Sequence, residues 1–205
     1  MGRLIVTEFV TLDGVAQAPG APEEDTADGF PHGGWQAPFM NEEGGNDIFE
    51  QAKNMDALLL GRRTYEIFAN YWPHASEEMP FTGLLNGVPK YVASQTLTDP
   101  LGWEGSTVIG ESVAEGVAAV KERHEEVHVI GSLDLVQSLL TFGLIDRLEL
   151  WIYPLLLGSG KQVFAGGTVP TALKLANSAT YDNGVVQVSY ETTGTPTYGD
   201  MTQPD

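Results

Sequence analysis

The stretch ALLLGRRTYE at residues 57–66 and the stretch VHVIGSLDLVQSLL at residues 127–140 decide the fold. In each, a short apolar run of strand-forming residues ends at a glycine, and a helical pattern follows. The two stretches predict strand-to-helix junctions, where backbone N–H groups and the positive end of a helix dipole can bind an anion. Two such junctions, the first with the paired Arg62 and Arg63, indicate a nucleotide clamp.

Strand and helix patterns alternate along the rest of the chain. Strands are predicted at residues 4–11, 57–60, 90–94, 107–109, 127–130, 147–153 and 185–191, and helices at residues 47–54, 64–71, 112–123 and 133–142. Ser112 and Glu115 form a capping box for the third helix, and Gly143 is a left-handed cap for the last. The alternation implies an α/β fold with a mostly parallel sheet covered on both faces. The turn sequence at residues 182–184 adds an antiparallel hairpin at the end.

The composition of the 205 residues, of which 42% are hydrophobic, predicts one domain over residues 1–193. The tail at residues 194–205 lacks apolar anchors and is expected to be disordered. No stretch reaches the roughly 20 apolar residues that span a bilayer, and the start does not resemble a signal peptide. We therefore expect a cytoplasmic protein. The absence of cysteine excludes disulfides, thiolate nucleophiles and cysteine metal sites.

The formal charge of −18, from 28 acidic and 10 basic residues, opposes binding to the phosphate backbone of nucleic acids. The few cations therefore gain significance where an anionic ligand would need compensation. Arg62, Arg63, Lys90 and Lys161 lie beside glycines or at strand starts. For Lys90, the simplest interpretation is a solubilising surface residue.

The segment at residues 16–46 is rich in glycine, proline and acids and is too long for a passive connection. It is either disordered or a working loop over a pocket. Its apolar residues Phe30, Trp35, Phe39 and Met40 favour the working loop, because they give it surface to pack against the domain.

Three local patterns imitate enzyme motifs. His124 and His128 have the H-E-x-x-H spacing of zinc proteases, but the pattern straddles a helix end and a strand start, so the two side chains should diverge. Ser112 lies where a nucleophile elbow would place it, yet no histidine follows His128 and a helix cap explains the serine. The sequence at residues 158–161 lacks the first glycine and the Ser/Thr of a P-loop, and the chain has no G-x-G-x-x-G.

The sequence resembles the superfamily of RibD C-terminal domains and dihydrofolate reductases, in its riboflavin-reductase branch. The resemblance rests on TLDGVAQAPG at residues 11–20, LLLGRRTYE at 58–66, YVAS at 91–94 and VIGSLDLVQSLLTFGLIDRLELWIYPLLLGSGKQVF at 129–164. It implies a dihydrofolate-reductase-like, three-layer fold with NADPH extended across the carboxyl edge of the sheet. It also implies a homodimer, in which the apolar run at residues 148–157 is either a buried central strand or part of the subunit contact.

The resemblance further implies a set of cofactor-binding residues. Gly61 permits close approach to the phosphates, Arg62 donates to them, and Thr64 caps the helix while reaching the same oxygens. Ser132 stands where relatives often have a second glycine, and it can cap the next helix and donate to a phosphate. The full implied set is Gly61, Arg62, Arg63, Thr64, Ser94, Gln95, Gly131, Ser132, Leu133 and Asp134, with Ser94 and Gln95 at the adenosine ribose and its 2′-phosphate.

On the substrate side, Leu12, Asp13 and Gly14 match the loop that flanks nicotinamide and substrate, although Asp-Gly is also a strong turn former. Trp35 either packs over the substrate or anchors the long loop. Asp13 and Asp47 are the acids expected to supply a proton or to anchor the substrate, and a pKa raised by burial would suit the first role.

The expected activity is an NADPH-dependent reduction of a C=N or C=O group in a small molecule, such as a pterin or a ribosylaminopyrimidine. Two alternatives stay open. One is a nucleotide-binding protein on this fold without turnover. The other is a hydrolase that uses Ser112 or a metal.

Overall fold

The computed structural model describes residues 1–110, 112–164 and 166–202. Its centre is one eight-stranded sheet with the order β4-β3-β2-β5-β1-β6-β8-β7. The strands are β1 (Arg3–Thr11), β2 (Ala57–Gly61), β3 (Lys90–Ala93), β4 (Ser106–Ile109), β5 (Glu126–Ile130), β6 (Arg147–Tyr153), β7 (Ala172–Thr180) and β8 (Val186–Gly194). The strands from β4 to β6 in this order run parallel, and β8 and β7 form an antiparallel hairpin beside β6.

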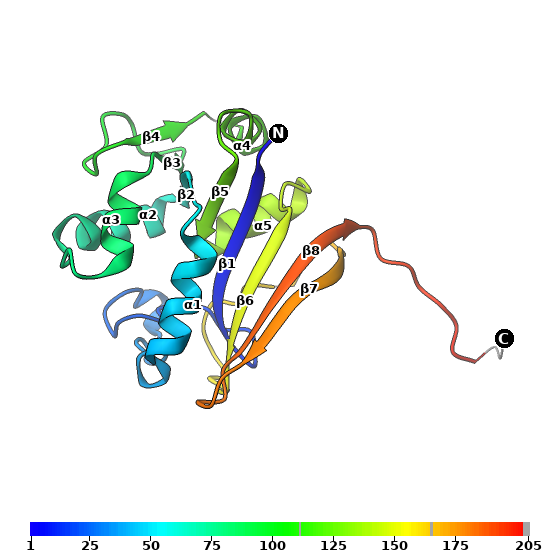
Figure 1. Cartoon of the computed structure of the whole chain (residues 1–205). Helices are drawn as coiled ribbons and strands as arrows, with labels where there is room; N and C mark the ends of the chain where they lie inside the picture. The colour runs from blue at the N-terminus through cyan, green and yellow to red at the C-terminus, as the bar shows by residue number, and fades with distance from the viewer. Residues whose placement is uncertain (111, 165, 203–205) are drawn as a thin grey trace.

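Helices cover both faces of the sheet (Figure 1). They are α1 (Glu42–Ala52), α2 (Arg62–Tyr71), α3 (Pro80–Gly87), α4 (Val113–Arg123) and α5 (Leu133–Thr141). Val117 of α4 and Leu139 of α5 share one apolar core with Val129 of the sheet. On the opposite face, α1, α2 and α3 pack on the alternate residues of β2 and β3. The predicted α/β class, with a mostly parallel sheet between helices, is confirmed.

Several local predictions are confirmed. The Ser112 hydroxyl accepts a hydrogen bond of 3.3 Å from the Glu115 N–H at the start of α4. Gly143 follows α5 with φ +61°. The Tyr181 N–H donates to the Val185 carbonyl over 3.0 Å, which closes the predicted hairpin turn. The apolar run after residue 147 forms β6, a buried strand between β1 and β8.

Other elements differ from the prediction. Helix α1 begins at Glu42, five residues before the predicted start, because Asn41 caps it and Gly44 and Gly45 obscure its apolar pattern. Helix α2 begins at Arg62, two residues early. Helix α3, with Pro80 in its first turn, was not predicted, and neither was β7 as a strand. The side chains of β7 are mostly exposed on both faces, so it lacks the alternation that marks a half-buried strand.

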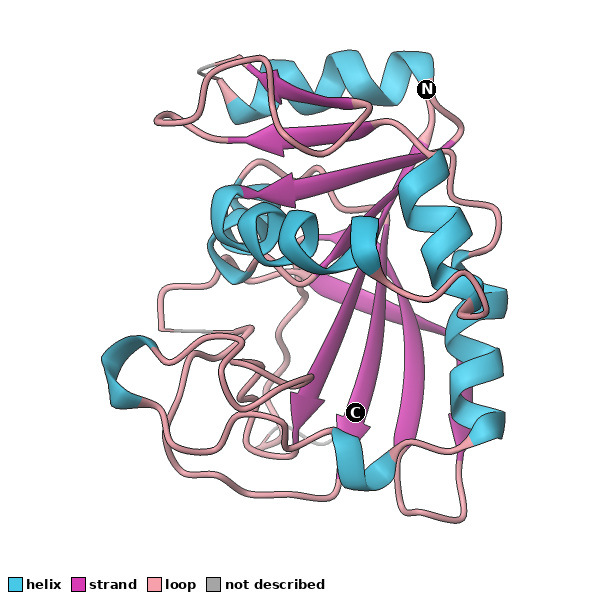
Figure 2. Cartoon of the chain, turned by 90° about the vertical axis from the view of Figure 1, so that its left-hand side faces the viewer, coloured by secondary structure: helices cyan, strands magenta, loops and turns pink. Residues whose placement is uncertain are grey.

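The segment at residues 16–46 is folded, so the disordered alternative is wrong. It contains the short 3-10 helices Ala27–Gly29 and Ala37–Phe39. Phe30 and Trp35 are buried in one aromatic cluster, whereas Met40 is exposed. The segment lies among the loops that follow the carboxyl ends of the strands (Figure 2).

Lys90 contradicts the surface interpretation, because its side chain is fully buried at the amino end of β3. Its Nζ donates to the carbonyls of Asn86 over 2.7 Å and Glu104 over 3.0 Å and lies 4.5 Å from the centre of the Trp103 ring. Burial lowers the pKa of Lys90 to about 8. This lysine therefore stabilises the fold and is not accessible to an anionic ligand.

The tail starts one residue later than predicted, because Gly194 still belongs to β8. Disorder of the tail stays a prediction, and residues 203–205 of it lie outside the described part of the chain. Among the described residues, no helix combines the length and the apolar character needed to cross a membrane.

Candidate functional site

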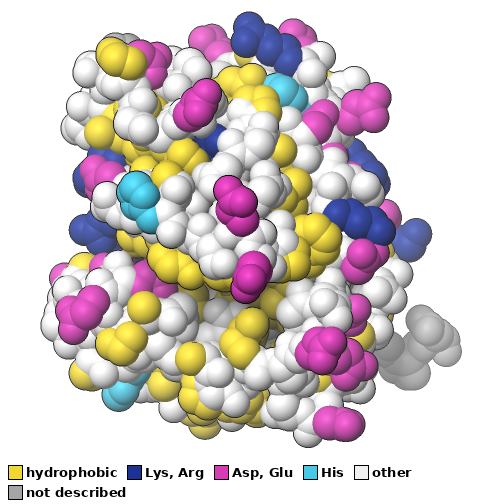
Figure 3. Space-filling model, turned by 60° about the vertical axis from the view of Figure 1, so that its left-hand side comes forward, with side chains coloured by type: hydrophobic (Ala, Val, Ile, Leu, Met, Phe, Trp, Pro, Cys, Tyr) yellow, Lys and Arg dark blue, Asp and Glu magenta, His cyan; other side chains and the backbone are white. Residues whose placement is uncertain are grey.

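The predicted site residues gather at one edge of the sheet, because the carboxyl ends of parallel strands point the same way. Ser94 follows β3, Gly61 ends β2, Gly131 follows β5 and Asp13 follows shortly after β1. These four strands are consecutive neighbours in the sheet. In Figure 2 the upper strand arrowheads point to the left and the lower ones point downward, toward the long loops. Figure 3 shows hydrophobic side chains in a band across the middle of the face that it draws, with Lys or Arg side chains at both ends of the band.

The two glycine junctions form a single structure. Strands β2 and β5 pair in parallel, with Ala57 beside Val127. At their carboxyl ends, the Gly61 N–H donates to the Ser132 hydroxyl over 2.8 Å. A Cβ added to Gly131 would lie 3.7 Å from Cγ2 and 3.9 Å from Oγ1 of Thr64. The start of α2 therefore contacts the turn that begins α5, although the two are far apart in the sequence.

The expected capping roles of Thr64 and Ser132 are wrong. Helix α2 starts at Arg62, so Thr64 lies inside its first turn and Gly61 takes the cap position without a side chain. Ser132 does occupy the cap position of α5, but it follows the left-handed Gly131 and is itself left-handed, with φ 70° and ψ 56°. Its hydroxyl therefore bonds to Gly61 instead of capping α5.

Both helices consequently present unused donors at this edge. The first N–H groups of an α-helix have no acceptor within the helix, and a side-chain cap normally satisfies one of them. Helices α1 and α4 have such caps, from Asn41 and Ser112. Helices α2 and α5 have none. The backbone donors of residues 62–64 and 133–135 thus lie near one another where the two helices start.

The two arginines of the first junction are paired with acids. Arg62 donates from Nη1 to both carboxylate oxygens of Glu66, one turn along α2, at 3.1 Å each. Nη1 of Arg63 lies 3.7 Å from Oδ1 of Asp25, in the segment at residues 16–46. Both arginine side chains are about half exposed, at 44% and 56%. Exposed pairs of this kind are worth about 1 kcal/mol or less, so either arginine can turn toward a ligand.

Four other implied cofactor residues have mixed suitability. The Ser94 hydroxyl accepts from the N–H groups of Thr96 at 3.1 Å and Leu97 at 2.9 Å, which closes a turn, and it lies 3.5 Å from the Thr96 hydroxyl. Gln95 is exposed beside it. Leu133 packs against the core, and the exposed Asp134 carries a negative charge in the first turn of α5. Only the backbone of Asp134 could therefore favour an anion.

Asp13 does not have the raised pKa that a proton donor would need. Its carboxylate accepts from the Thr11 hydroxyl at 2.5 Å and from the N–H groups of Leu157 at 3.1 Å and Gly158 at 2.7 Å. The bond from Thr11, followed by the bond from Gly158, lowers the pKa of Asp13. Gly14, with φ +82°, completes the expected Asp-Gly turn, and the side chain of Leu12 is 68% exposed. Asp13 thus holds the loop after β6 against the loop after β1.

Asp47 and Trp35 belong to the β6 end of the same edge. The Tyr181 hydroxyl donates to Asp47 Oδ2 over 2.7 Å, and burial, followed by this carboxylate, raises the pKa of Tyr181. Trp35 packs edge-on against Tyr153 and donates from Nε1 to the Gln17 carbonyl over 2.8 Å. Its burial favours the anchoring role. The cavity lined by Phe39, Tyr153 and Tyr181 is about 10 Å³, which is room for about one water.

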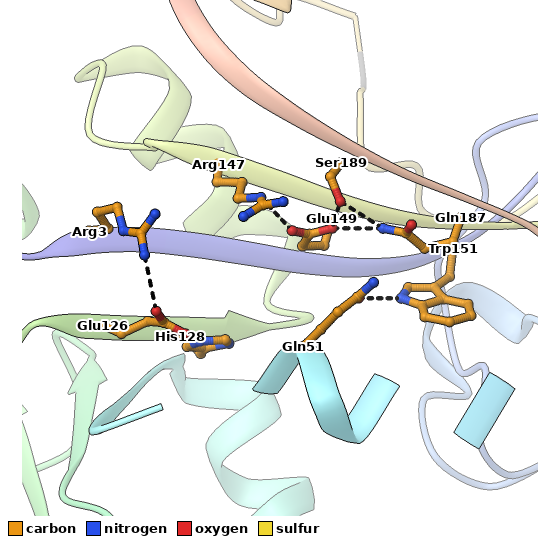
Figure 4. Close-up of polar contacts among 9 residues, drawn as sticks. All are labelled: Arg3, Gln51, Glu126, His128, Arg147, Glu149, Trp151, Gln187 and Ser189. Atoms are coloured by element: carbon orange, nitrogen blue, oxygen red, sulfur yellow. Dashed lines mark hydrogen bonds and ion pairs between the residues drawn. The ribbon is translucent and has the colours of Figure 1, made fainter. Parts of the chain in front are cut away.

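Sequence reasoning missed a polar layer between α1 and the sheet (Figure 4). Glu149 on β6 accepts from Gln187 at 2.7 Å, is bonded by the Ser189 hydroxyl and pairs with Arg147 at 2.6 Å. Burial raises the pKa of Glu149 despite these partners. Alternate polar residues in the strand sequence of β6 were the available signal. The layer lies beneath a helix, away from the uncapped helix starts.

Glu8 is a second missed acid, on the α5 face of the sheet. Its side chain is 2% exposed and its Oε1 has no hydrogen-bond partner among the described residues. It lies beside the second junction, because the Gly131 N–H donates to the carbonyl of the preceding residue, Thr7, over 3.2 Å. Burial raises the pKa of Glu8 to about 8.

Comparison with known proteins gives one family match. The model of the family described as "RibD C-terminal domain" matches residues 3–187. The uncharacterized protein YyaP of Bacillus subtilis (strain 168) is 27% identical over 196 residues, which cover 94% of this chain and 96% of YyaP.

Solved structures share the fold. A Shewanella sp. PV-4 protein assigned to riboflavin biosynthesis aligns with a TM-score of 0.67 and 20% identity over 93% of this chain and 99% of its own. A pyrimidine reductase-like protein of Corynebacterium diphtheriae aligns with a TM-score of 0.63 and 13% identity over 94% and 92%. The third is the Thermotoga maritima diaminohydroxyphosphoribosylaminopyrimidine deaminase/5-amino-6-(5-phosphoribosylamino)uracil reductase. It aligns with a TM-score of 0.63 and 14% identity over 94% of this chain and 57% of its own chain. These matches confirm the expected dihydrofolate-reductase-like fold.

The buried Glu8 predicts a specific dependence of stability on pH. Folded Glu8 keeps its proton up to about pH 8, whereas an unfolded glutamate loses it near 4.5. Folding therefore takes up a proton at Glu8 in this window, and the contribution of Glu8 to the free energy of unfolding falls by about 1.4 kcal/mol per pH unit as pH rises. Glu8→Gln removes this slope. The free energy of unfolding of the variant, measured with urea, should therefore rise relative to that of the wild type from pH 5 to pH 8. The exposed Glu23→Gln is the control, and a gap between Glu8→Gln and wild type that stays constant with pH would contradict the prediction.

Proposed function

This chain belongs to the RibD C-terminal domain family, and on that premise we propose that it is an NADPH-dependent reductase. Hydride would pass from NADPH to a C=N or C=O carbon of a small molecule. The family and the reductase-like structural neighbours support an oxidoreductase of this general type.

The observation that carries the proposal is the pair of uncapped helix starts joined by the Gly61–Ser132 hydrogen bond. A pyrophosphate is a doubly charged anion with several acceptor oxygens, and converging backbone donors with a helix dipole suit it. Gly131 has φ +68°, so a side chain would strain the turn there. Arg62 and Arg63 would supply the positive charge. The residues present therefore fit the phosphates of a dinucleotide.

The position of Ser94 and Gln95 supports NADPH over NADH. These residues follow β3, directly beside β2 in the sheet, so they lie next to the phosphate site along the edge. The exposed amide of Gln95 can donate to a ribose and its 2′-phosphate, and so can the Ser94 hydroxyl, whose contact with the Thr96 hydroxyl is long at 3.5 Å. Leu12, Asp13 and Gly14, in the loop after β1, would hold the nicotinamide end, because this loop lies at the same edge on the other side of β5.

Bound NADPH would supply the hydride, and the protein would supply orientation and exclusion of water. Asp13 would act as a positioning residue, because its carboxylate stays ionised and fixes the backbone of Leu157 and Gly158 beside the loop after β1. An ordered water is the better proton source at this position. Asp47, bonded to Tyr181, would orient the aromatic cluster at the β6 end of the edge.

The substrate is proposed to be a planar heterocycle such as a pterin or an aminopyrimidine. The activity named for the Thermotoga protein supports the pyrimidine class. The segment at residues 16–46 contains no lysine or arginine. It therefore offers no positive charge that could bind the phosphate of a substrate. This favours an uncharged substrate.

A non-catalytic nucleotide-binding protein is the second candidate. Two observations favour it: the carboxylate of Asp13 is fully engaged by hydrogen bonds, and the cavity beside Tyr153 holds about one water. Consumption of NADPH with any pterin, aminopyrimidine or carbonyl compound would exclude this candidate.

The protein is further proposed to be a cytoplasmic homodimer that contacts no nucleic acid or membrane. The face of the hairpin opposite α1 exposes Leu173 and Leu175, at 40% and 52%. Beside it is an apolar groove of about 260 Å³ lined by Leu140, Phe164 and Val169. Such a surface on an acidic protein is typical of a subunit contact.

The first prediction concerns cofactor binding. Calorimetric titration should give micromolar binding of NADPH and weaker binding of NADH. Thr64→Val should lower NADPH affinity about five- to ten-fold, because it removes a hydroxyl at the phosphates without changing side-chain size. Arg62→Ala should lower it as well, whereas Arg123→Ala, which removes the same charge at the end of α4, should not. Binding of neither nucleotide to the wild type would refute the reductase.

The second prediction concerns turnover. With any accepted substrate, Asp13→Asn and Asp47→Asn should each lower kcat at least ten-fold, because both carboxylates accept hydrogen bonds that fix the site. The pH profile of kcat for Asp13→Asn should keep every ionisation of the wild-type profile, since Asp13 positions the loop and donates no proton. If both variants keep wild-type kcat, neither acid contributes to the site.

The third prediction concerns assembly. Sedimentation velocity should show a dimer that Leu175→Glu converts to a monomer, because it places a charge in the apolar face. Lys174→Glu, on the opposite face of β7, should leave the dimer intact. A monomeric wild type, or equal effects of the two variants, would rule out this contact.

A further inference from the structure

Asp25 pairs with two cations that come from different parts of the chain. Its Oδ2 accepts from Nζ of Lys161 at 2.5 Å, and its Oδ1 lies 3.7 Å from Nη1 of Arg63. Burial acts to raise the pKa of Asp25, but the hydrogen bonds from Lys161 and the Ala27 N–H and the charges of Lys161 and Arg63 together lower it below its usual value. The carboxylate is therefore a fixed negative charge between two cations.

The position of this bridge can be derived from the sheet. Arg63 is the second residue of α2, just after β2 ends. Lys161 is held at the end of β1, because its carbonyl accepts from the Ala16 N–H at 2.9 Å and its N–H donates to Gln17 Oε1 at 3.0 Å. Strand β5 lies between β2 and β1. The bridge from Arg63 through Asp25 to Lys161 thus spans the edge of the sheet at the end of β5, where Gly131 and Ser132 follow the strand.

The bridge also determines where the segment at residues 16–46 lies. Gln17 is buried and donates from Nε2 to the carbonyls of Asp25 and Ala27, at 3.1 Å each. Asp25 is therefore held by its backbone near the end of β1 and by its side chain to α2. Release of the side chain would free this part of the segment from α2 without breaking the contacts of Trp35.

A phosphate at the two helix starts and a carboxylate at Asp25 would compete for the same charge. The segment carries Glu23, Glu24 and Asp28 in addition to Asp25 and has no lysine or arginine to offset them. A ligand with two or more negative charges beside Arg63 would repel this segment and attract both cations. Arg63 is 56% exposed and Lys161 is 30% exposed, so both side chains can reorient.

We propose that Arg63 and Lys161 form a phosphate subsite that Asp25 occupies as an internal anion, and that a phosphate-bearing nucleotide displaces Asp25 and releases the segment from α2. The inference rests on the proposed function for the identity of the nucleotide. The exchange itself requires only a multiply charged phosphate, because the subsite contains no group that reads a base or a sugar.

The test compares calorimetric binding of NADPH and of inorganic pyrophosphate to the wild type, Asp25→Asn and Glu23→Gln. Asp25→Asn should bind both ligands about five-fold more tightly, because the cations are no longer neutralised from within. Glu23→Gln removes the same charge from the same segment and should change affinity less than two-fold. In the wild type, hydrogen exchange of residues 20–28 should accelerate when either ligand binds.

The outcomes separate the inference from the proposed function. Tighter pyrophosphate binding by Asp25→Asn without any NADPH binding would support the subsite and contradict the reductase. NADPH binding that Asp25→Asn leaves unchanged or weakens would support the cofactor assignment and overturn the displacement. Equal gains in affinity in Asp25→Asn and Glu23→Gln would also overturn the displacement, since the effect would then come from the overall charge of the segment. Failure of Asp25→Asn to bind either ligand would exclude the subsite.

Discussion

The hydrogen bond from the Gly61 N–H to the Ser132 hydroxyl is the interaction on which the site depends. It joins the ends of β2 and β5, and it uses the side chain that would otherwise cap α5. In this arrangement the backbone of Ser132 is left-handed, which costs about 1 kcal/mol for a residue other than glycine. The result is two helix starts side by side with free backbone donors, at the edge where all parallel strands end.

The electrostatics of the edge follow from an acidic chain with few cations. Arg62 is held by Glu66, and Arg63 and Lys161 by Asp25. Each of these cations is thus neutralised by a nearby carboxylate. Each ion pair is partly exposed, so the cation can leave its carboxylate for another anion. A chain of charge −18 would otherwise repel a phosphate at long range, so exchangeable ion pairs beside backbone donors would suit the proposed anion site.

Local signals were sufficient to predict most of the fold. The apolar runs ending in glycine, the Ser112 cap and the turn before Val185 are each determined by a few neighbouring residues, and the structure has all of them. The misassigned features depend on distant contacts. Ser132 looks like a cap until β2 supplies Gly61, Lys90 looks like a surface residue until α3 and Trp103 enclose it, and Asp25 meets Lys161 only across 136 positions of sequence. Edge strand β7 was missed because exposure removes its alternation.

The measurement that tests the central claim most directly is an NMR titration of ¹⁵N-labelled protein with NADP⁺. If the two helix starts form one anion site, the amide signals of residues 62–64 and of residues 133–135 should shift together and give the same dissociation constant. Shifts confined to one of the two helices, or absent from both while NADP⁺ binds elsewhere, would contradict a shared site.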